Sequence, residues 1–277
     1  MEVRKMTRKP FEELTIADNF MFCKVMEHKA ICKEFLEIVF RCKIEKITYL
    51  MSENTVTTNS SAKTIRLDVL VKDGSGSSYD LEMQVGNEYN IPKRMRYYQA
   101  VLDVAFLDKG YSYKGLNNSL IIFICLFDPI GNNRAVYTFE NICIEDRSIL
   151  LRDGTKKIIL NASAFTAADN QELHGFLQYV KTGEVTTEYT GRIEKMIQTV
   201  KSSERARKEY HILPAVLMDA FDEGIERGKS LGLAEGKVRG SHQKALETAR
   251  LMKQANCEIP FIEKMTGLSK AEVEAIK

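Results

Sequence analysis

The sequence predicts an α/β fold in which helices flank a mixed β-sheet. Two stretches near the N-terminus repeat apolar residues at helical spacing, and the next two alternate apolar and polar residues as strands of a hairpin do. Another helical stretch then leads to a continuous apolar run at residues 120–127, the length of a buried central strand. This order of helices, hairpin, helix and strand is typical of α/β proteins.

Composition limits the class of protein. The chain has 277 residues, of which 44% are hydrophobic, enough for a globular core. No apolar stretch reaches the about 18 residues that a membrane span needs, and the first ten residues lack the apolar segment of a secretory signal. The six cysteines form no CxxC pair, and the four histidines fit no zinc spacing. We therefore expect a cytoplasmic protein with reduced cysteines and no membrane partner.

Charge and motifs exclude further functions. The 40 basic and 38 acidic residues leave a net charge of +2, which excludes a uniformly basic nucleic-acid coat but not a local basic patch. The sequence contains no P-loop, no GxGxxG and no GxSxG motif. Nucleotide binding and serine hydrolase chemistry are therefore not indicated.

The first two predicted elements are helices. Asp18 can cap the first of them. The apolar faces comprise Phe22, Val25 and Met26 in the first helix, and Ile31, Phe35, Ile38 and Val39 in the second.

The hairpin that follows fixes which residues face each other. If the turn at residues 73–77 is centred on Ser75, residues whose numbers sum to 150 are partners. Asp68 then lies opposite Glu82, and Arg66 lies opposite Gln84, all on one face of the hairpin. The odd-numbered face is apolar and should pack into the core. A slip of one residue would break these pairs.

Opposed carboxylates at Asp68 and Glu82 repel each other, and a divalent cation would remove that repulsion. Carboxylate oxygens suit Mg²⁺, which takes one or two carboxylates together with water and phosphate oxygens. Such an ion can polarise a phosphodiester and activate water. The alternative is a solvent-facing polar side of the sheet, and periodicity alone does not exclude it.

A helix from about Ile91 should follow the hairpin, with Asn90 as its cap and Pro92 in its first turn. Arg94 and Arg96 near its start oppose the helix dipole but suit phosphate contacts; a solvated face is the alternative. Tyr98 could stack on a base or pack in the core. The apolar run ends at Asp128-Pro129, and shorter strands are expected at residues 135–139, 149–152 and 157–160, then helices from Ala167.

The C-terminal region has a different character. Glycine recurs every fourth residue, at Gly224, Gly228, Gly232, Gly236 and Gly240. Five glycines weaken a helix by about 4–5 kcal/mol relative to alanine. The segment is therefore either a loose helical connector or a closely packed helix that supports self-association. Two short helices should end the chain, with Gly267 as a C-terminal cap and Ser269 as an N-cap. No basic recognition face is visible, which favours a helical hairpin over a DNA-binding helix-turn-helix.

These residues carry a family resemblance. Asp68 and the later Glu82-Met83-Gln84 resemble the D…ExK signature of PD-(D/E)XK nucleases, in the variant with glutamine found in the Rpn, or transposase-like, branch. Residues 14–26, 92–99 and 123–129 resemble further motifs of that branch, in the same order. The likeness covers residues from about 14 to 165, and the glycine-spaced tail is also typical of the family.

The resemblance implies a restriction-endonuclease-like core at residues 1–165, a helical extension at 166–218, and a glycine-spaced segment with a helical hairpin at 219–277. It implies a metal-dependent DNA endonuclease with recombination-promoting activity. Asp68 and Glu82 would hold Mg²⁺, with Mn²⁺ or Ca²⁺ as alternatives, and Gln84 would take the place of the usual catalytic lysine.

The remaining expectations concern DNA and assembly. Arg94, Arg96 and Tyr98 are the candidate DNA contacts, and Asp18 or a nearby acid would complete the site from the first helix. The C-terminal region could join copies of the chain into a homo-oligomer. Because glutamine carries no charge, the alternative function is a DNA-binding or assembly protein that has lost efficient cleavage.

Overall fold

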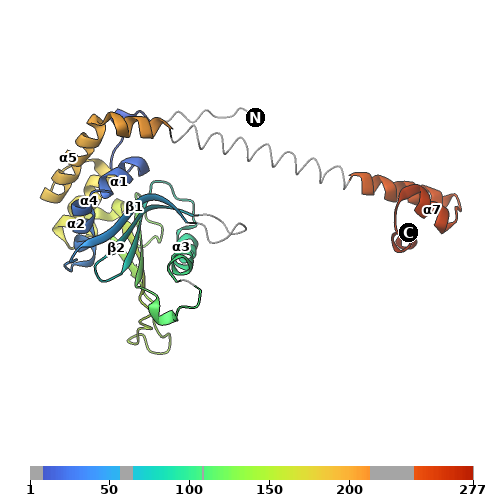
Figure 1. Cartoon of the computed structure of the whole chain (residues 1–277), viewed down its shortest axis with the longest axis horizontal. Coiled ribbons are helices and arrows are strands. Elements are labelled where there is room, and N and C mark those ends of the chain that lie inside the picture. Colours follow the sequence, from blue (N-terminus) through green and yellow to red (C-terminus); the bar gives the residue numbers. More distant parts are fainter. Residues whose placement is uncertain (1–8, 57–64, 108, 213–239, 277) are drawn as a thin grey trace. The chain divides into compact units, whose positions relative to one another are not determined.

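The computed structural model describes residues 9–56, 65–107, 109–212 and 240–276 (Figure 1). The chain divides into two compact units, Met1–Tyr210 and His211–Lys277. Four glycines of the predicted repeat (Gly224, Gly228, Gly232 and Gly236) and the side chain of Arg66 lie outside the described part. The interpretations that rest on them remain predictions.

A six-stranded mixed sheet organises the first unit, in the order β1-β2-β3-β4-β6-β5. Strands β3, β4 and β6 run parallel to one another, and the remaining neighbours pair antiparallel. The sheet and its flanking helices confirm the predicted α/β fold. The strands are β1 (Ile47–Val56), β2 (Ile65–Asp73), β3 (Ser78–Gln84), β4 (Ser119–Cys125), β5 (Val136–Phe139) and β6 (Thr155–Asn161).

The hairpin of β2 and β3 has the predicted register. Val69 pairs with Leu81 and Leu70 pairs with Asp80, so partner numbers sum to 150. The Asp73 carboxylate fixes the turn, because its Oδ1 accepts hydrogen bonds from the backbone N–H groups of Ser75 (2.8 Å) and Ser77 (3.1 Å).

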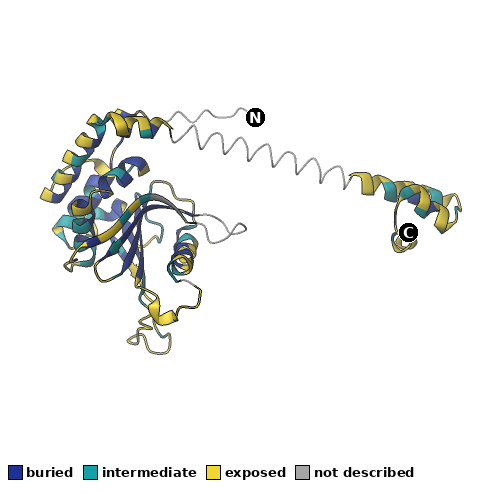
Figure 2. Cartoon of the chain, viewed as in Figure 1, coloured by how far each residue is buried: buried dark blue, intermediate teal, exposed yellow. Residues whose placement is uncertain are grey.

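Helices cover both faces of the sheet (Figure 1). Helices α1 (Asn19–Met26), α2 (Lys29–Phe40), α4 (Gln171–Thr182) and α5 (Glu188–Ser202) pack together on one side, and α3 (Ile91–Phe106) lies on the other. Short 3₁₀ helices occur at Phe11–Glu13, Tyr113–Gly115 and Ala162–Ala167. Figure 2 shows the buried sheet between helices whose outer faces are exposed.

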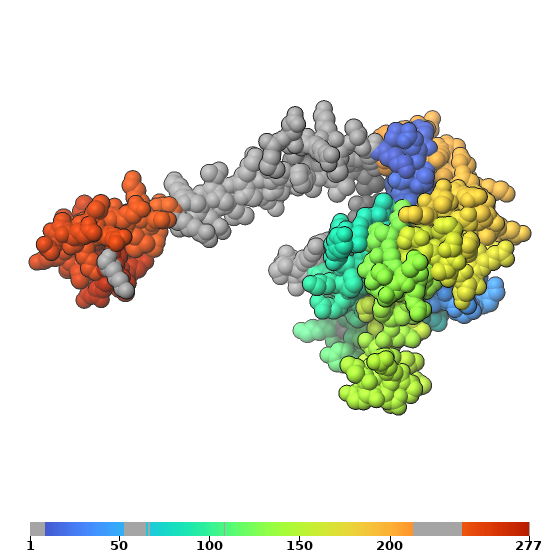
Figure 3. Space-filling model, turned by 180° about the vertical axis from the view of Figure 1, so that it is seen from behind, coloured from blue at the N-terminus to red at the C-terminus, as the bar shows by residue number. Residues whose placement is uncertain are grey.

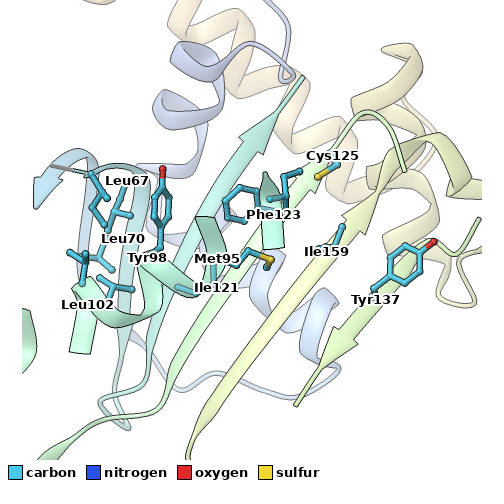
Figure 4. Close-up of a cluster of buried hydrophobic side chains, with 13 residues drawn as sticks. Leu67, Leu70, Met95, Tyr98, Leu102, Ile121, Phe123, Cys125, Tyr137 and Ile159 are labelled. Carbon is cyan, nitrogen blue, oxygen red and sulfur yellow. The ribbon is translucent and has the colours of Figure 1, made fainter. Parts of the chain in front are cut away.

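Helix α3 is fixed by an apolar cluster (Figure 4). Its Met95, Tyr98 and Leu102 are buried against the sheet. The sheet contributes Leu70 of β2, Ile121, Phe123 and Cys125 of β4, and Ile159 of β6. Because β3 lies between β2 and β4, this packing holds the first turns of α3 near the carboxyl end of β3.

Two strand predictions need correction. Strand β1 was not predicted; it is an edge strand that exposes Tyr49 and Met51, and it has a register shift after Ile47, so its pattern is irregular. The predicted strand at residues 149–152 is wrong, because Leu150 makes only an isolated bridge to Ile142. The connection from β5 to β6 around these residues projects from the first unit (Figure 3).

Asp18 and Asn90, the predicted caps of α1 and α3, occupy the N-cap positions of these helices. Their side chains make no capping hydrogen bond and bind other groups instead. Asp18 Oδ2 accepts hydrogen bonds from the Thr15 backbone N–H and from Lys9 Nζ, both at 2.7 Å. Asn90 Nδ2 donates to Glu88 Oε2 at 3.1 Å. Such side chains can form hydrogen bonds with other nearby groups. A capping residue therefore predicts where a helix starts better than it predicts the capping hydrogen bond.

The second unit has its own small core of Ala249, Ile262, Leu268 and Val273. Residues 240–254 are helical, followed by α7 (Ile259–Thr266) and α8 (Lys270–Ala275). Gly267 ends α7 with a φ of 71°, and Ser269 forms a capping box with Glu272, so both predicted caps are confirmed. Among the helices that the structure describes, none is long and apolar enough to cross a lipid bilayer.

Candidate active site

Three acidic side chains gather under α3, where β2 and β3 separate. Asp68 is 7% exposed, Glu82 is 2% exposed and Asp80 is fully buried. Asp80 and Glu82 pair in parallel register with Ile121 and Phe123, which places them on the sheet face that α3 covers. The alternative of a solvent-facing polar side is therefore wrong for these acids.

Asp68 and Glu82 hold each other through crossed hydrogen bonds. The printed β2–β3 pairing ends at Val69 and Leu81, and beyond it side chains replace backbone acceptors. Glu82 Oε1 accepts from the Asp68 backbone N–H at 2.9 Å, and Asp68 Oδ2 accepts from the Met83 backbone N–H at 3.0 Å. These crossed bonds fix the orientation of both carboxylates.

The first helix contributes an amide where an acid was expected. Asn19 Nδ2 donates a hydrogen bond to Asp68 Oδ1, and Cys23 Sγ lies 3.3 Å from the Asp68 carbonyl oxygen. Asp18, the predicted candidate, is engaged by Thr15 and Lys9 instead. Sequence reasoning missed Asn19, because its neighbour Asp18 offered both a charge and a capping role.

Burial and mutual repulsion raise the pKa of two of the acids. Desolvation raises the pKa of Asp80 well above its usual range, and the negative charge of Asp68 adds to the effect. Desolvation likewise raises the pKa of Glu82, followed by the charges of Asp80 and Asp68. No donor among the described residues reaches either oxygen of Asp80. Its polar neighbour is the Glu82 carboxyl, and that contact is favourable only when the two share a proton.

Arg94 of α3 points into this group of acids. Its Nη1 donates to Gln84 Oε1 at 2.6 Å, and its Nη2 lies 3.1 Å from the Tyr98 hydroxyl and 3.5 Å from Glu82 Oε2. Of the candidate DNA contacts, only Arg96 has an exposed side chain.

The ring of Tyr98 is 8% exposed and lies 6.1 Å from that of Phe123, within the α3 cluster (Figure 4). A base cannot stack on a ring in that position, so the structure supports the core-packing interpretation.

The residues fit a divalent cation. Asp68 and Glu82 present carboxylate oxygens, the donor type that Mg²⁺ prefers, and Mg²⁺ needs only one or two of them. Within the described ranges, no three His, Cys, Asp or Glu side chains form a closed metal cage, so water and substrate would complete the coordination. Neither oxygen of the buried Asp80 beside them has a hydrogen-bond donor among the described residues, and a cation would favour its ionised form.

Comparison with known proteins gives one finding. A family model described as PD-(D/E)XK nuclease family transposase matches residues 19–219, well over half of the chain. The match begins at Asn19 and includes the hairpin, α3 and α5. Neither the curated proteins nor the solved structures include a match to this chain.

Proposed function

This chain belongs to the PD-(D/E)XK nuclease family transposases, as its motifs predicted, and from that membership we propose that it is a metal-dependent DNA endonuclease. The observation that carries the proposal is the buried group of Asp68 on β2 and Asp80 and Glu82 on β3, of which Glu82 lies towards the carboxyl end of its strand. Ligands of open α/β sheets bind outside the carboxyl ends of the strands. Burial of three acids is unfavourable for folding, so a chemical role is the better explanation.

Each residue at the site has a proposed role. Asp68 and Glu82 hold the divalent cation, most readily Mg²⁺, with Mn²⁺ or Ca²⁺ as alternatives. When bound, the ion supplies a Lewis acid for the phosphate and lowers the pKa of water. Asn19 and the Met83 backbone N–H orient the Asp68 carboxylate, and the Asp68 backbone N–H orients Glu82. Gln84 takes the position of the family's usual lysine.

The reaction is hydrolysis of one phosphodiester bond. The oxygen of water bonds to phosphorus and one P–O ester bond breaks. The leaving sugar oxygen keeps the electron pair and takes up a proton, while the attacking water releases one. The fixed carboxylates favour this by holding the reacting groups in one geometry.

DNA would approach from the exposed start of α3, where Arg96 can contact phosphates. A cleft nearby is lined by Val85 and Leu126, which directly follow β3 and β4, and by Lys181 and Lys201. Its lysines suit a DNA backbone that passes the carboxyl ends of these strands.

One observation favours the alternative of a DNA-binding or assembly protein without efficient cleavage. Gln84 stands where the family's lysine would be, and its amide oxygen is already occupied by Arg94. In this alternative the fold binds DNA, and the acids no longer support turnover.

Cleavage of supercoiled plasmid tests the proposal. Purified protein is incubated with Mg²⁺, Mn²⁺, Ca²⁺ or EDTA, beside Glu82→Gln and the control Glu140→Gln. Glu140 pairs with Lys156 at 2.9 Å, outside the site. We expect metal-dependent nicking that Glu140→Gln retains and Glu82→Gln loses. Nicking that survives in EDTA or in Glu82→Gln contradicts the proposal. DNA binding without nicking under any metal supports the alternative.

A further inference from the structure

The position of Gln84 leaves a specific gap in the site. A lysine there would supply a positive charge next to the metal-binding acids, and an amide cannot do so. Charge that develops on a phosphoryl oxygen during hydrolysis is stabilised by a cation or a fixed donor. A positively charged side chain from another part of the chain would fill this gap beside the metal ion.

Arg94 is the cation that the fold places beside Gln84. Its Nη1 donates to Gln84 Oε1 at 2.6 Å, so the two side chains are joined directly. Its Nη2 lies 3.5 Å from Glu82 Oε2, which puts the guanidinium at the same acids that a lysine at position 84 would serve. Arg94 follows β3 by one loop and the first turn of α3, which explains this approach.

The guanidinium is held in place on several sides. It lies 5.2 Å from the ring centre of Phe123 and 5.5 Å from that of Tyr98, and its side chain is only 25% exposed. The Tyr98 hydroxyl at 3.1 Å gives a further polar contact. An arginine guanidinium keeps its positive charge in proteins, so the group is a permanent cation at this position.

Arg94 also keeps donors for a substrate. A guanidinium has five N–H groups in a fixed fork. Three contacts, to Gln84, Glu82 and Tyr98, account for its hydrogen bonds within the part of the chain that the structure describes. Two N–H groups remain for the oxygens of a phosphate, a geometry that arginine fits well.

We infer that Arg94 replaces the missing lysine as the cation that stabilises the scissile phosphate, and that Gln84 is a positioning residue for Arg94. This assignment rests on the proposed nuclease function. It differs from a general DNA contact, because Arg94 would act on the reacting phosphate, whereas Arg96 would act on affinity.

The inference is tested by removing the positive charge at position 94 and placing one at position 84. The variants are Arg94→Met, Arg94→Lys, and Gln84→Lys combined with Arg94→Met. Arg205→Met is the control, because that side chain is 90% exposed on the helix at residues 204–212. Plasmid cleavage gives kcat and KM, DNA affinity is measured under an ion condition that gives no cleavage, and thermal melting checks folding.

We expect Arg94→Met to lower kcat by about 10²–10³-fold, the range seen when one transition-state donor is removed. DNA affinity and melting temperature should change little. A lysine at position 84 should restore part of kcat in the Arg94→Met background, and Arg94→Lys should retain part of it. Arg205→Met should match the wild type.

Three outcomes overturn the inference. Arg94→Met could cleave as fast as the wild type, or its loss could lie in KM and DNA affinity alone. Gln84→Lys could also fail to restore cleavage to a folded Arg94→Met protein. In each case, wild-type cleavage that Glu82→Gln abolishes would leave the proposed nuclease function standing. Absence of wild-type cleavage with every metal would remove both.

Discussion

Asp80 is the residue of the site whose burial is hardest to explain by packing. Neither carboxylate oxygen has a donor within the described ranges, and Glu82 and Asp68 lie nearby with like charge. A buried polar group without a partner costs about 1–3 kcal/mol, and more when it is charged. The fold keeps this unfavourable group beside two other acids, as expected where a cation binds.

Asp80→Asn should therefore stabilise the metal-free protein at neutral pH by about 1–3 kcal/mol. The folded-state pKa of Asp80 is raised, so its penalty is absent below the unfolded pKa and grows as pH rises towards the folded value. The gain from Asn should be large at pH 7.5 and small at pH 4. Urea unfolding at both values measures it, and an equal gain at both would contradict this account.

Strand alternation predicted that Asp68, Glu82 and Gln84 share one face of the hairpin. Their roles came from the family resemblance and remain predictions. Asp80 shares that face, but its depth is set by α3, which the alternation does not report. Arg94 was placed correctly on its helix, but its contacts with Gln84, Tyr98 and Glu82 were not predicted. Its inward direction depends on how α3 crosses β3 and β4.

At the scale of the elements, α4 and α5 approach each other closely. A Cβ on Gly175 of α4 would lie 2.3 Å from Cγ2 of Thr187, the residue that caps α5. This approach lets α4 and α5 pack beside α1 and α2, where Tyr189 donates to the Ile31 carbonyl oxygen.

Gly175→Ala should destabilise the first unit by about 1–3 kcal/mol, the usual cost of overpacking. Gly191 in α5 is the matched control, because a Cβ added there would lie 3.9 Å from Cγ1 of Val185, an ordinary van der Waals distance. Gly191→Ala should be neutral or stabilising, by up to about 1 kcal/mol, because alanine favours helices. Thermal melts of both variants would decide, and equal effects would show that the close approach is not the cause.

Elements with strong internal signals were predictable. The turn residues 73–77 fixed the hairpin register, and apolar periodicity fixed α2 and α3. Strand β1 was missed because an edge strand needs apolar residues on few positions, and it exposes Tyr49 and Met51. The false strand near Leu150 arose because its exposed apolar residues resemble those of a buried strand.

At the scale of the whole molecule, the two units have separate cores. In the first unit, the ring centres of Phe176 of α4 and Phe35 of α2 are 5.0 Å apart, and the Tyr210 hydroxyl donates a hydrogen bond to the Lys9 carbonyl oxygen. In the second, Ala249 packs with Ile262 and Val273. The proposed boundaries near residues 165 and 218, and assembly through the C-terminal region, remain to be tested.

A chain that ends at Ile212 tests the boundary near residue 218 and the assembly. We expect it to unfold cooperatively and to retain metal-dependent cleavage, because the first unit contains the whole proposed site. If the C-terminal region joins copies of the chain, light scattering should give a larger particle for the full chain than for the shortened one. Particles of equal subunit number would reject the assembly proposal.

The crossed bonds of Asp68 and Glu82 make two backbone amides sensitive to what occupies the site. The N–H groups of Asp68 and Met83 are shielded by the same carboxylates that would bind a cation. An ion bound by the other oxygen of each carboxylate would hold these bonds in place, so the deuterium uptake of both amides should fall with Mg²⁺ while that of Leu70 stays constant. Deuterium uptake at these two amides would then report whether an ion occupies the site, in the absence of DNA.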